Sequence, residues 1–163
     1  PRPFNSGGRL GYAGLDMATD PDGFDLLSWH DCSIHGISFR TGDPAAGDWT
    51  SELVLDLDFI TDSVRGGSGT QFMLAPTTLV FHDVIDVKIN LDLGNQVLHP
   101  VSIDKIEREP DKGGQHYLWR VKLNWPTDGE ITFGATRFTQ TIRAKPIVCE
   151  QQYLRTVDRA ALS

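Results

Sequence analysis

The densest group of chemically capable side chains lies in the stretch WHDCSIH, residues 29–35. It contains two histidines, an aspartate and a cysteine, which are residue types that bind transition metals or transfer protons in catalysis. A second His-Asp pair occurs within FHDVID, at residues 82–83. A metal-dependent hydrolase is therefore one hypothesis for this chain, and its candidate ligands are His30, His35, His82 and Asp83.

Strand geometry argues against a metal centre in the first stretch. Side chains of a β-strand alternate between its two faces, so His30 and His35 point to opposite sides of a regular strand. Ile34 and Ile37 also have opposite parity, and Gly36 between them predicts a β-bulge with a positive φ angle. Even with a bulge the two histidines stay well separated along the strand. We favour polar side chains at the mouth of a strand, with no catalytic residue and no cofactor.

Period-two alternation dominates the rest of the chain. Apolar and polar residues alternate through SELVLDLDFI, VIDVKINLDL and HYLWRVKLNW, which predicts half-buried strands over 52–60, 84–93 and 116–125. Weaker strand patterns flank Pro76, which indicates an edge, a bend or a strand switch. Strands near 101–109, 116–125 and 129–143 are expected to form an antiparallel meander, with a bulge in the first and a bend at Gly134 in the last.

The predicted fold class is all-β. We expect about eight mainly antiparallel strands in a sandwich or partly open barrel. Leu154, Val157 and Ala161 have helical spacing and predict a short C-terminal helix. Residues 1–16 lack periodicity and precede Met17, so we interpret them as an expression leader or a disordered arm, followed by a single β domain over 17–163.

Composition limits the classes of function. Two cysteines are too few for a disulfide framework, and no apolar run is long enough for a membrane helix, which favours a cytoplasmic protein. The net charge is −7, and residues 41–111 contain 13 acidic and four basic residues. Such an acidic segment repels nucleic acid and suits a basic protein partner. Asp56 with Asp58, and Asp86 with Asp92, share strand faces, so they either form a solvated acidic face or, if their strands are neighbours, a calcium or acid–base site.

Tryptophans provide a third hypothesis. Trp119 and Trp125 fall on core-facing positions of a predicted strand, whereas Trp29 and Trp49 flank loops. Loop tryptophans can line the mouth of a small-ligand-binding β-barrel. Cys32, by contrast, has the pattern of a small buried residue.

Two segments together resemble a family of small uncharacterised bacterial β-rich proteins. The first is Trp29-His30-Asp31 followed by Ile34, Gly36-Ile37 and Phe39, and the second is Ala-Pro-x-Thr-Leu-x-Phe at 75–81. The resemblance covers roughly residues 26–159. Proteins of this kind are loosely similar to immunity proteins of bacterial toxin systems. The resemblance implies a soluble bacterial domain and assigns no catalytic residue.

The first hypothesis is therefore a non-enzymatic binding domain that contacts a basic protein partner through an acidic face. The chain would be a monomer or a homodimer, with an exposed edge strand as the means of pairing. The candidate binding residues are Trp29, His30, Asp31, His35, Asp56, Asp58, Asp86 and Asp92.

Overall fold

A computed structural model describes residues 16–19, 23–66, 69–94 and 100–162. The predicted leader falls almost wholly on residues 1–15, which lie outside the described residues, while Asp16 belongs to the first strand. In the described part of the chain, no helix is long and apolar enough to span a membrane.

Strands make up most of the described chain, as the alternation predicted. They are β1 (Asp16–Thr19), β2 (Ser33–Thr41), β3 (Ser51–Gly66), β4 (Gly69–His82), β5 (Ile85–Asn90), β6 (Val101–Pro110), β7 (Tyr117–Trp125), β8 (Glu130–Ala135), β9 (Arg137–Ile142) and β10 (Ile147–Cys149). The helical elements are the 3-10 turns η1 (Phe24–Leu26) and η2 (Pro44–Ala46) and the helix α1 (Thr156–Ala161).

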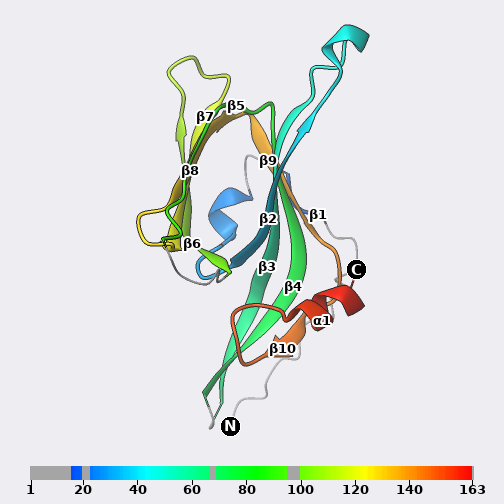
Figure 1. Ribbon diagram of the computed structural model, residues 1–163, viewed down its shortest axis with the longest axis vertical. Coiled ribbons are helices and arrows are strands. Elements are labelled where there is room, and N and C mark those ends of the chain that lie inside the picture. The colour runs from blue at the N-terminus through cyan, green and yellow to red at the C-terminus, as the bar shows by residue number, and fades with distance from the viewer. Residues whose placement is uncertain (1–15, 20–22, 67–68, 95–99, 163) are drawn as a thin grey trace, which may run out of the picture.

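All strands pair antiparallel in one open, curled sheet. Nine strands follow the order β1-β9-β4-β3-β2-β6-β7-β8-β5, and β10 adds to β4 beside this path. The two parts of the sheet meet where β2 pairs with β6, through Ser33 with Ser102 and Ile34 with Val101. Backbone hydrogen bonds of Ile103 with Asp31 and Cys32 continue this junction just ahead of β2. Figure 1 shows β6, β7 and β8 curling round to face β2, β3 and β4, with η1 between them.

Several local predictions are confirmed. The register between β2 and β3 shifts between Ile34 and Gly36, where the bulge was expected. The strands β6, β7 and β8 form the predicted meander, and the register of β6 shifts near Ile103. A short helix ends the chain at Thr156–Ala161.

Three local predictions are wrong in detail. Gly36 does not have a positive φ, so the bulge does not depend on glycine. The segment 129–143 is not one strand bent at Gly134, because Thr136 separates β8 from β9 and these strands lie in different parts of the sheet. The two short strands expected around Pro76 are one strand, β4.

Pro76 marks a change of neighbour rather than a break. On one side of it β10 pairs with Phe72–Leu74, and on the other β9 pairs with β4 from Thr77 onward. Pro76 has no N–H to donate, so it is tolerated where β4 passes from one partner to the next.

The core lies between the facing parts of the sheet. Leu53, Leu55 and Leu57 of β3 are fully buried on one face. They pack in a cluster with the aromatic side chains of Phe81, Trp119, Phe133 and Phe138. Phe24 of η1 packs against this cluster, and its ring centroid lies 5.4 Å from that of Trp119.

The opposite face of β3 is covered by the C-terminal segment, residues 143–161. Its strand β10 extends the sheet beside β4, and Leu154, 1% exposed, is its buried anchor. Polar residues of β3 that a free sheet would present to solvent therefore lie beneath this segment.

Candidate functional site

The first His-Asp pair forms a turn ahead of β2. Asp31 has a φ of 63°, and its two carboxylate oxygens accept hydrogen bonds from the side-chain amides of Asn124, at 2.7 Å, and Gln152, at 3.0 Å. His30 is exposed, and its Nδ1 lies 2.8 Å from the backbone oxygen of Asp104. The pair thus connects the strand mouth to β7 and to the C-terminal segment, in line with the structural role that strand geometry favoured.

The second His-Asp pair forms the corner between β4 and β5. Asp83 has a φ of 55° and accepts a 2.6 Å hydrogen bond from the hydroxyl of Thr136. The two ring nitrogens of His82 lie 2.9 Å from Oε1 of Glu52 and 3.0 Å from the hydroxyl oxygen of Thr139. Aspartate is one of the few side chains that adopt a positive φ readily, which explains its place in both corners.

The side chains proposed as metal ligands under the hydrolase hypothesis do not converge among the described residues. In the described part of the chain, no three His, Cys, Asp or Glu side chains come close enough together to hold an ion. The histidine of each pair is engaged by a different set of neighbours. The candidate ligands His30, His35, His82 and Asp83 therefore contact different partners.

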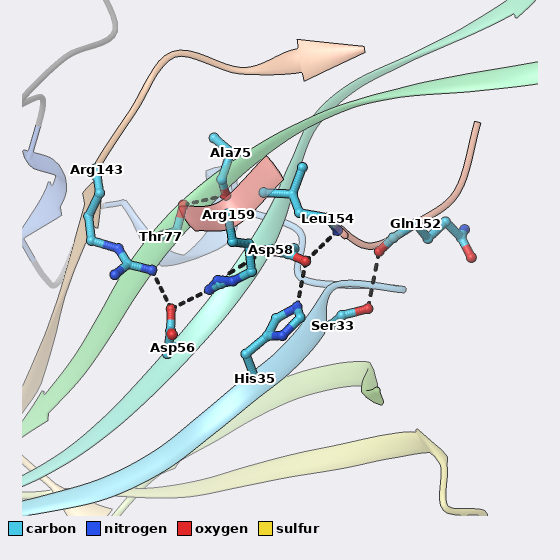
Figure 2. Close-up of polar contacts among 10 residues, drawn as sticks. All are labelled: Ser33, His35, Asp56, Asp58, Ala75, Thr77, Arg143, Gln152, Leu154 and Arg159. Atoms are coloured by element: carbon cyan, nitrogen blue, oxygen red, sulfur yellow. Dashed lines mark hydrogen bonds and ion pairs between the residues drawn. The ribbon is translucent and has the colours of Figure 1, made fainter. Parts of the chain in front are cut away.

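A buried ionic network lies instead between β2, β3 and the C-terminal segment (Figure 2). Its centre is Asp58, which is fully buried. Oδ2 of Asp58 lies 2.6 Å from Nε2 of His35 and accepts a 2.6 Å hydrogen bond from the backbone N–H of Leu154. Oδ1 lies 3.4 Å from a guanidinium nitrogen of Arg159. A carboxylate can be buried when cations and N–H donors surround it in this way.

Asp56, two residues earlier on the same face, binds the same segment. Its Oδ1 accepts hydrogen bonds from Arg143 and, at 2.6 Å, from Arg159. Arg159 therefore bridges both carboxylates from α1, as Figure 2 shows. A further contact beside the network is the 3.1 Å hydrogen bond from the hydroxyl of Ser33 to the backbone oxygen of Gln152.

These contacts change the meaning of the acidic pattern on β3. Asp58 is fully buried and Asp56 is 40% exposed, and two arginines balance their charges. The pair binds the chain's own C-terminal segment and is not a solvated contact surface. We predicted a solvated face through Asp56, Asp58, Asp86 and Asp92, and this prediction is wrong for Asp56 and Asp58.

Asp86 and Asp92 are exposed but lie elsewhere. Asp86 is in β5, at the opposite end of the strand path from β4 and β9, and Asp92 follows that strand. Since β5 does not pair with β3, the two sets of carboxylates do not form a joint calcium or acid–base site.

No protein-family model, curated protein or solved structure matches this chain.

The tryptophans expected at a pocket occupy two different environments. Trp29 is 4% exposed and belongs to the core, where its indole N–H donates a 2.8 Å hydrogen bond to Oε1 of Gln140. Trp49 is 77% exposed, in the loop that joins β2 to β3. Because one is in the core and the other is in an exposed loop, they do not form a barrel mouth together, and neither lines the cavities beside the C-terminal segment.

Open cavities instead follow the seam between the C-terminal segment and the sheet. One of about 640 Å³ is lined by His35, Tyr153, Arg155, Thr156 and apolar side chains. A neighbouring cavity of about 510 Å³ shares Tyr153 and is also lined by Trp125 and Glu150. Because Nε2 of His35 is engaged by Asp58, its Nδ1 is the ring nitrogen available to a ligand in the first cavity.

One group of carboxylates without ion-pair partners lies at one end of the molecule. Asp43 and Asp48 are in the β2–β3 loop, and Asp83 and Asp86 are at the β4–β5 corner; none has an ion-pair partner among the described residues. The base of the loop is joined to the corner by two hydrogen bonds between Ser51 and Val84, of 2.7 and 2.9 Å. We call this the hairpin-end surface, and it comprises Asp43, Asp48, Trp49, Asp83 and Asp86.

The loop holds its charged groups in fixed positions. Asp43 accepts a hydrogen bond from the backbone N–H of Ala45 and caps η2. The hydroxyl and backbone N–H of Thr50 both donate to Asp48 and hold the pKa of that carboxyl below its usual value. These hydrogen bonds favour the ionised form of Asp48, next to the exposed indole of Trp49.

Proposed function

We propose that this protein is a non-enzymatic binding domain that contacts a basic protein partner through the hairpin-end surface. The observation that carries the proposal is the exposed indole of Trp49 among carboxylates that have no cation of their own. Tryptophan is enriched among the residues that dominate interface energies, because it buries a large rigid area at low entropic cost. Surrounding carboxylates attract a basic surface and orient it before contact.

The shape of this end of the molecule supports the proposal. Figure 1 shows the β2–β3 loop (cyan) projecting beyond the sheet. Arg40, near the base of the loop, pairs with Glu52 at 3.3 Å and so does not offset the loop carboxylates. Arg137 opens β9 on the same side, and the four carboxylates outnumber it. A toxin whose basic substrate-binding surface is blocked by the loop would be a partner of this kind.

Isosteric neutralisation tests the proposal. Changing four carboxylates to amides keeps their capping hydrogen bonds and their tolerance of positive φ, and removes the charge. The test variant is Asp43→Asn/Asp48→Asn/Asp83→Asn/Asp86→Asn. The matched control removes the same charge elsewhere on the exposed surface and is Asp62→Asn/Asp104→Asn/Asp128→Asn/Glu150→Gln.

Immobilised wild-type protein and both variants would be used to capture partners from an extract of the native cell, followed by kinetics with the purified partner. We expect a partner of high pI that the control variant retains, with an association rate that falls in the test variant and in high salt. Trp49→Ala should weaken the same complex by about 2 kcal/mol or more, mainly through faster dissociation. Equal binding by the test variant and the control variant would exclude this surface.

One observation favours a second candidate function, the binding of a small molecule. The imidazole of His35 is fixed by a buried carboxylate and lines the cavity of about 640 Å³. A carboxylate that holds one ring nitrogen in this way sets the tautomer and leaves the other nitrogen to accept a hydrogen bond or a proton. NMR spectra of the imidazole, recorded during a fragment screen, would test this, with the exposed His30 as the internal control. A screen that never shifts the His35 resonances selectively would remove this candidate.

A further inference from the structure

The edge of β2 is half unpaired. From Gly36 to Thr41 the strand pairs with β3 on one side, but β6 pairs only with Ser33 and Ile34 on the other. In an antiparallel strand, alternate residues direct their N–H and C=O groups to each side. Among residues 16–19, 23–66, 69–94 and 100–162, the backbone groups of 37–41 that point away from β3 therefore have no strand partner.

This edge lacks the usual protection against strand addition. Natural sheets protect edges with lysine, proline, bulges or inward-pointing charges. The terminal strand β5 has such features, since it contains Lys88, a register shift and Asp86 with a φ of 54°. By contrast, Ile37-Ser38-Phe39-Arg40-Thr41 contains a single charge, on Arg40, and that charge is already paired with Glu52.

Phe39 marks the edge as an incomplete surface. It is 55% exposed, although its cross-strand neighbour Leu53 is fully buried on the same face. The core-facing side of β2 therefore extends beyond the core, where it presents the exposed side chain of Phe39. A strand added beside β2 would place a side chain directly against Phe39.

We infer that β2 pairs antiparallel with β2 of a second copy of this chain, in a two-fold dimer centred on Phe39. In this register Phe39 faces its own copy, Ser38 faces Arg40, and Ile37 faces Thr41. The segment is self-complementary, because aromatic meets aromatic and no like charges are opposed. Centring the pair on Arg40 would oppose two guanidinium groups, which disfavours that register.

The β2–β3 hairpin projects beyond the rest of the sheet, and the inferred pairing leaves its loop tip free. The paired segment ends at Thr41, before the loop that carries Asp43, Asp48 and Trp49. Dimer formation is thus independent of the proposed partner surface. A five-residue strand pair is small beside a standard protein interface, so we expect a weak, concentration-dependent dimer.

Sedimentation velocity of the purified full chain over a wide concentration range tests the inference. We expect wild type to shift from monomer to dimer as concentration rises. Ser38→Lys should remain monomeric, because it places a cation opposite Arg40 of the other copy. The control Ser63→Lys makes the same change on an exposed position of β3 and should still dimerise.

The register has its own test. Directly opposed residues of an antiparallel pair have Cα atoms about 4.5–5.5 Å apart, within the range of a disulfide. Phe39→Cys in a Cys149→Ser background should therefore form an intermolecular disulfide under mild oxidation, whereas exposed Val64→Cys in the same background should not. A monomeric wild type at all concentrations, or dimerisation that survives Ser38→Lys, would overturn the inference.

Discussion

Oδ2 of Asp58 lies 2.6 Å from Nε2 of His35 and is fully enclosed by the C-terminal segment. The aspartate is in β3, the histidine is the extra residue of the bulge in β2, and the backbone N–H of Leu154 completes the contact. The network therefore ties two neighbouring strands to a segment almost a hundred residues later. A buried carboxylate of this kind stabilises the native chain only while all its partners are present.

The first prediction concerns Asp58. Asp58→Asn keeps the shape but removes the buried charge that pairs with Arg159 and contacts His35, and we expect a loss of about 3–5 kcal/mol in the free energy of unfolding. The matched change Asp56→Asn acts on a half-exposed carboxylate and should cost about 1 kcal/mol or less. Urea unfolding monitored by tryptophan fluorescence measures both. Equal losses would show that burial of Asp58 does not determine its contribution.

The second prediction concerns thiol reactivity. Burial raises the pKa of Cys32 to about 12, with the charges of Asp31 and Asp58 adding to the effect. Burial also raises the pKa of Cys149, which is only partly covered. Because the thiolate is the reactive form, iodoacetamide should modify Cys149 first, at a rate that rises with pH, while Cys32 stays protected in the native state.

Mass spectrometry after limited alkylation measures the order of reaction of the two cysteines. Unfolding in urea removes the burial, so both should then react at similar rates. Prior modification of Cys32 in the native protein would mean that β2 opens more readily than its packing indicates.

The third prediction concerns the buried hydrogen bond between Trp29 and Gln140. Trp29→Phe leaves the amide of Gln140 without its donor, and Gln140→Leu leaves the indole N–H without an acceptor, so each change should cost about 1–3 kcal/mol beyond its packing effect. The double variant lacks both the indole N–H and the amide oxygen, so neither group is left without its partner. The double variant should therefore be more stable than the sum of the single changes predicts, by about 1–2 kcal/mol.

Equilibrium unfolding of the four proteins of this cycle gives the coupling energy. The side-chain nitrogen of Gln140 has no hydrogen-bond partner among the described residues, so part of its desolvation cost is already present in the wild type. A coupling energy near zero would show that the hydrogen bond contributes no net stability.

The sequence predicted strands well because alternation is a local property. A one-residue slip would move every apolar side chain of β3 or β7 to the wrong face, so the pattern itself defines strand and register. It also predicted the bulge before Gly36, where the parity of the apolar residues changes. These features depend on residues that are close together in the chain.

The candidate site could not be predicted in the same way. Arg143 and Arg159, which neutralise Asp56, lie 87 and 103 residues away from it along the chain. Nothing in the local pattern separates a carboxylate on a solvated face from one beneath a later segment. A signal was present in the composition, because residues 131–163 contain five Lys or Arg against two acidic residues, a charge opposite to that of the acidic middle.

The last prediction concerns two glycines that the sequence presented as equivalent points of irregularity. A Cβ added at Gly134 would lie 2.7 Å from Cγ1 of Ile85. Glycine is needed at this position because Ile85 of the neighbouring strand β5 packs directly against the backbone of β8. A Cβ added at Gly36 would lie 3.6 Å from the Cβ of Asp56, which is an ordinary van der Waals contact. The φ angle of Gly36 is not positive. Gly134→Ala should therefore lose about 1–3 kcal/mol of unfolding free energy through overpacking, whereas Gly36→Ala should be neutral or stabilising by up to about 1 kcal/mol. Thermal unfolding of the two variants measures the contrast, and the reverse order would mean that the bulge of β2, and not the approach of β5 to β8, is the strained point of the sheet.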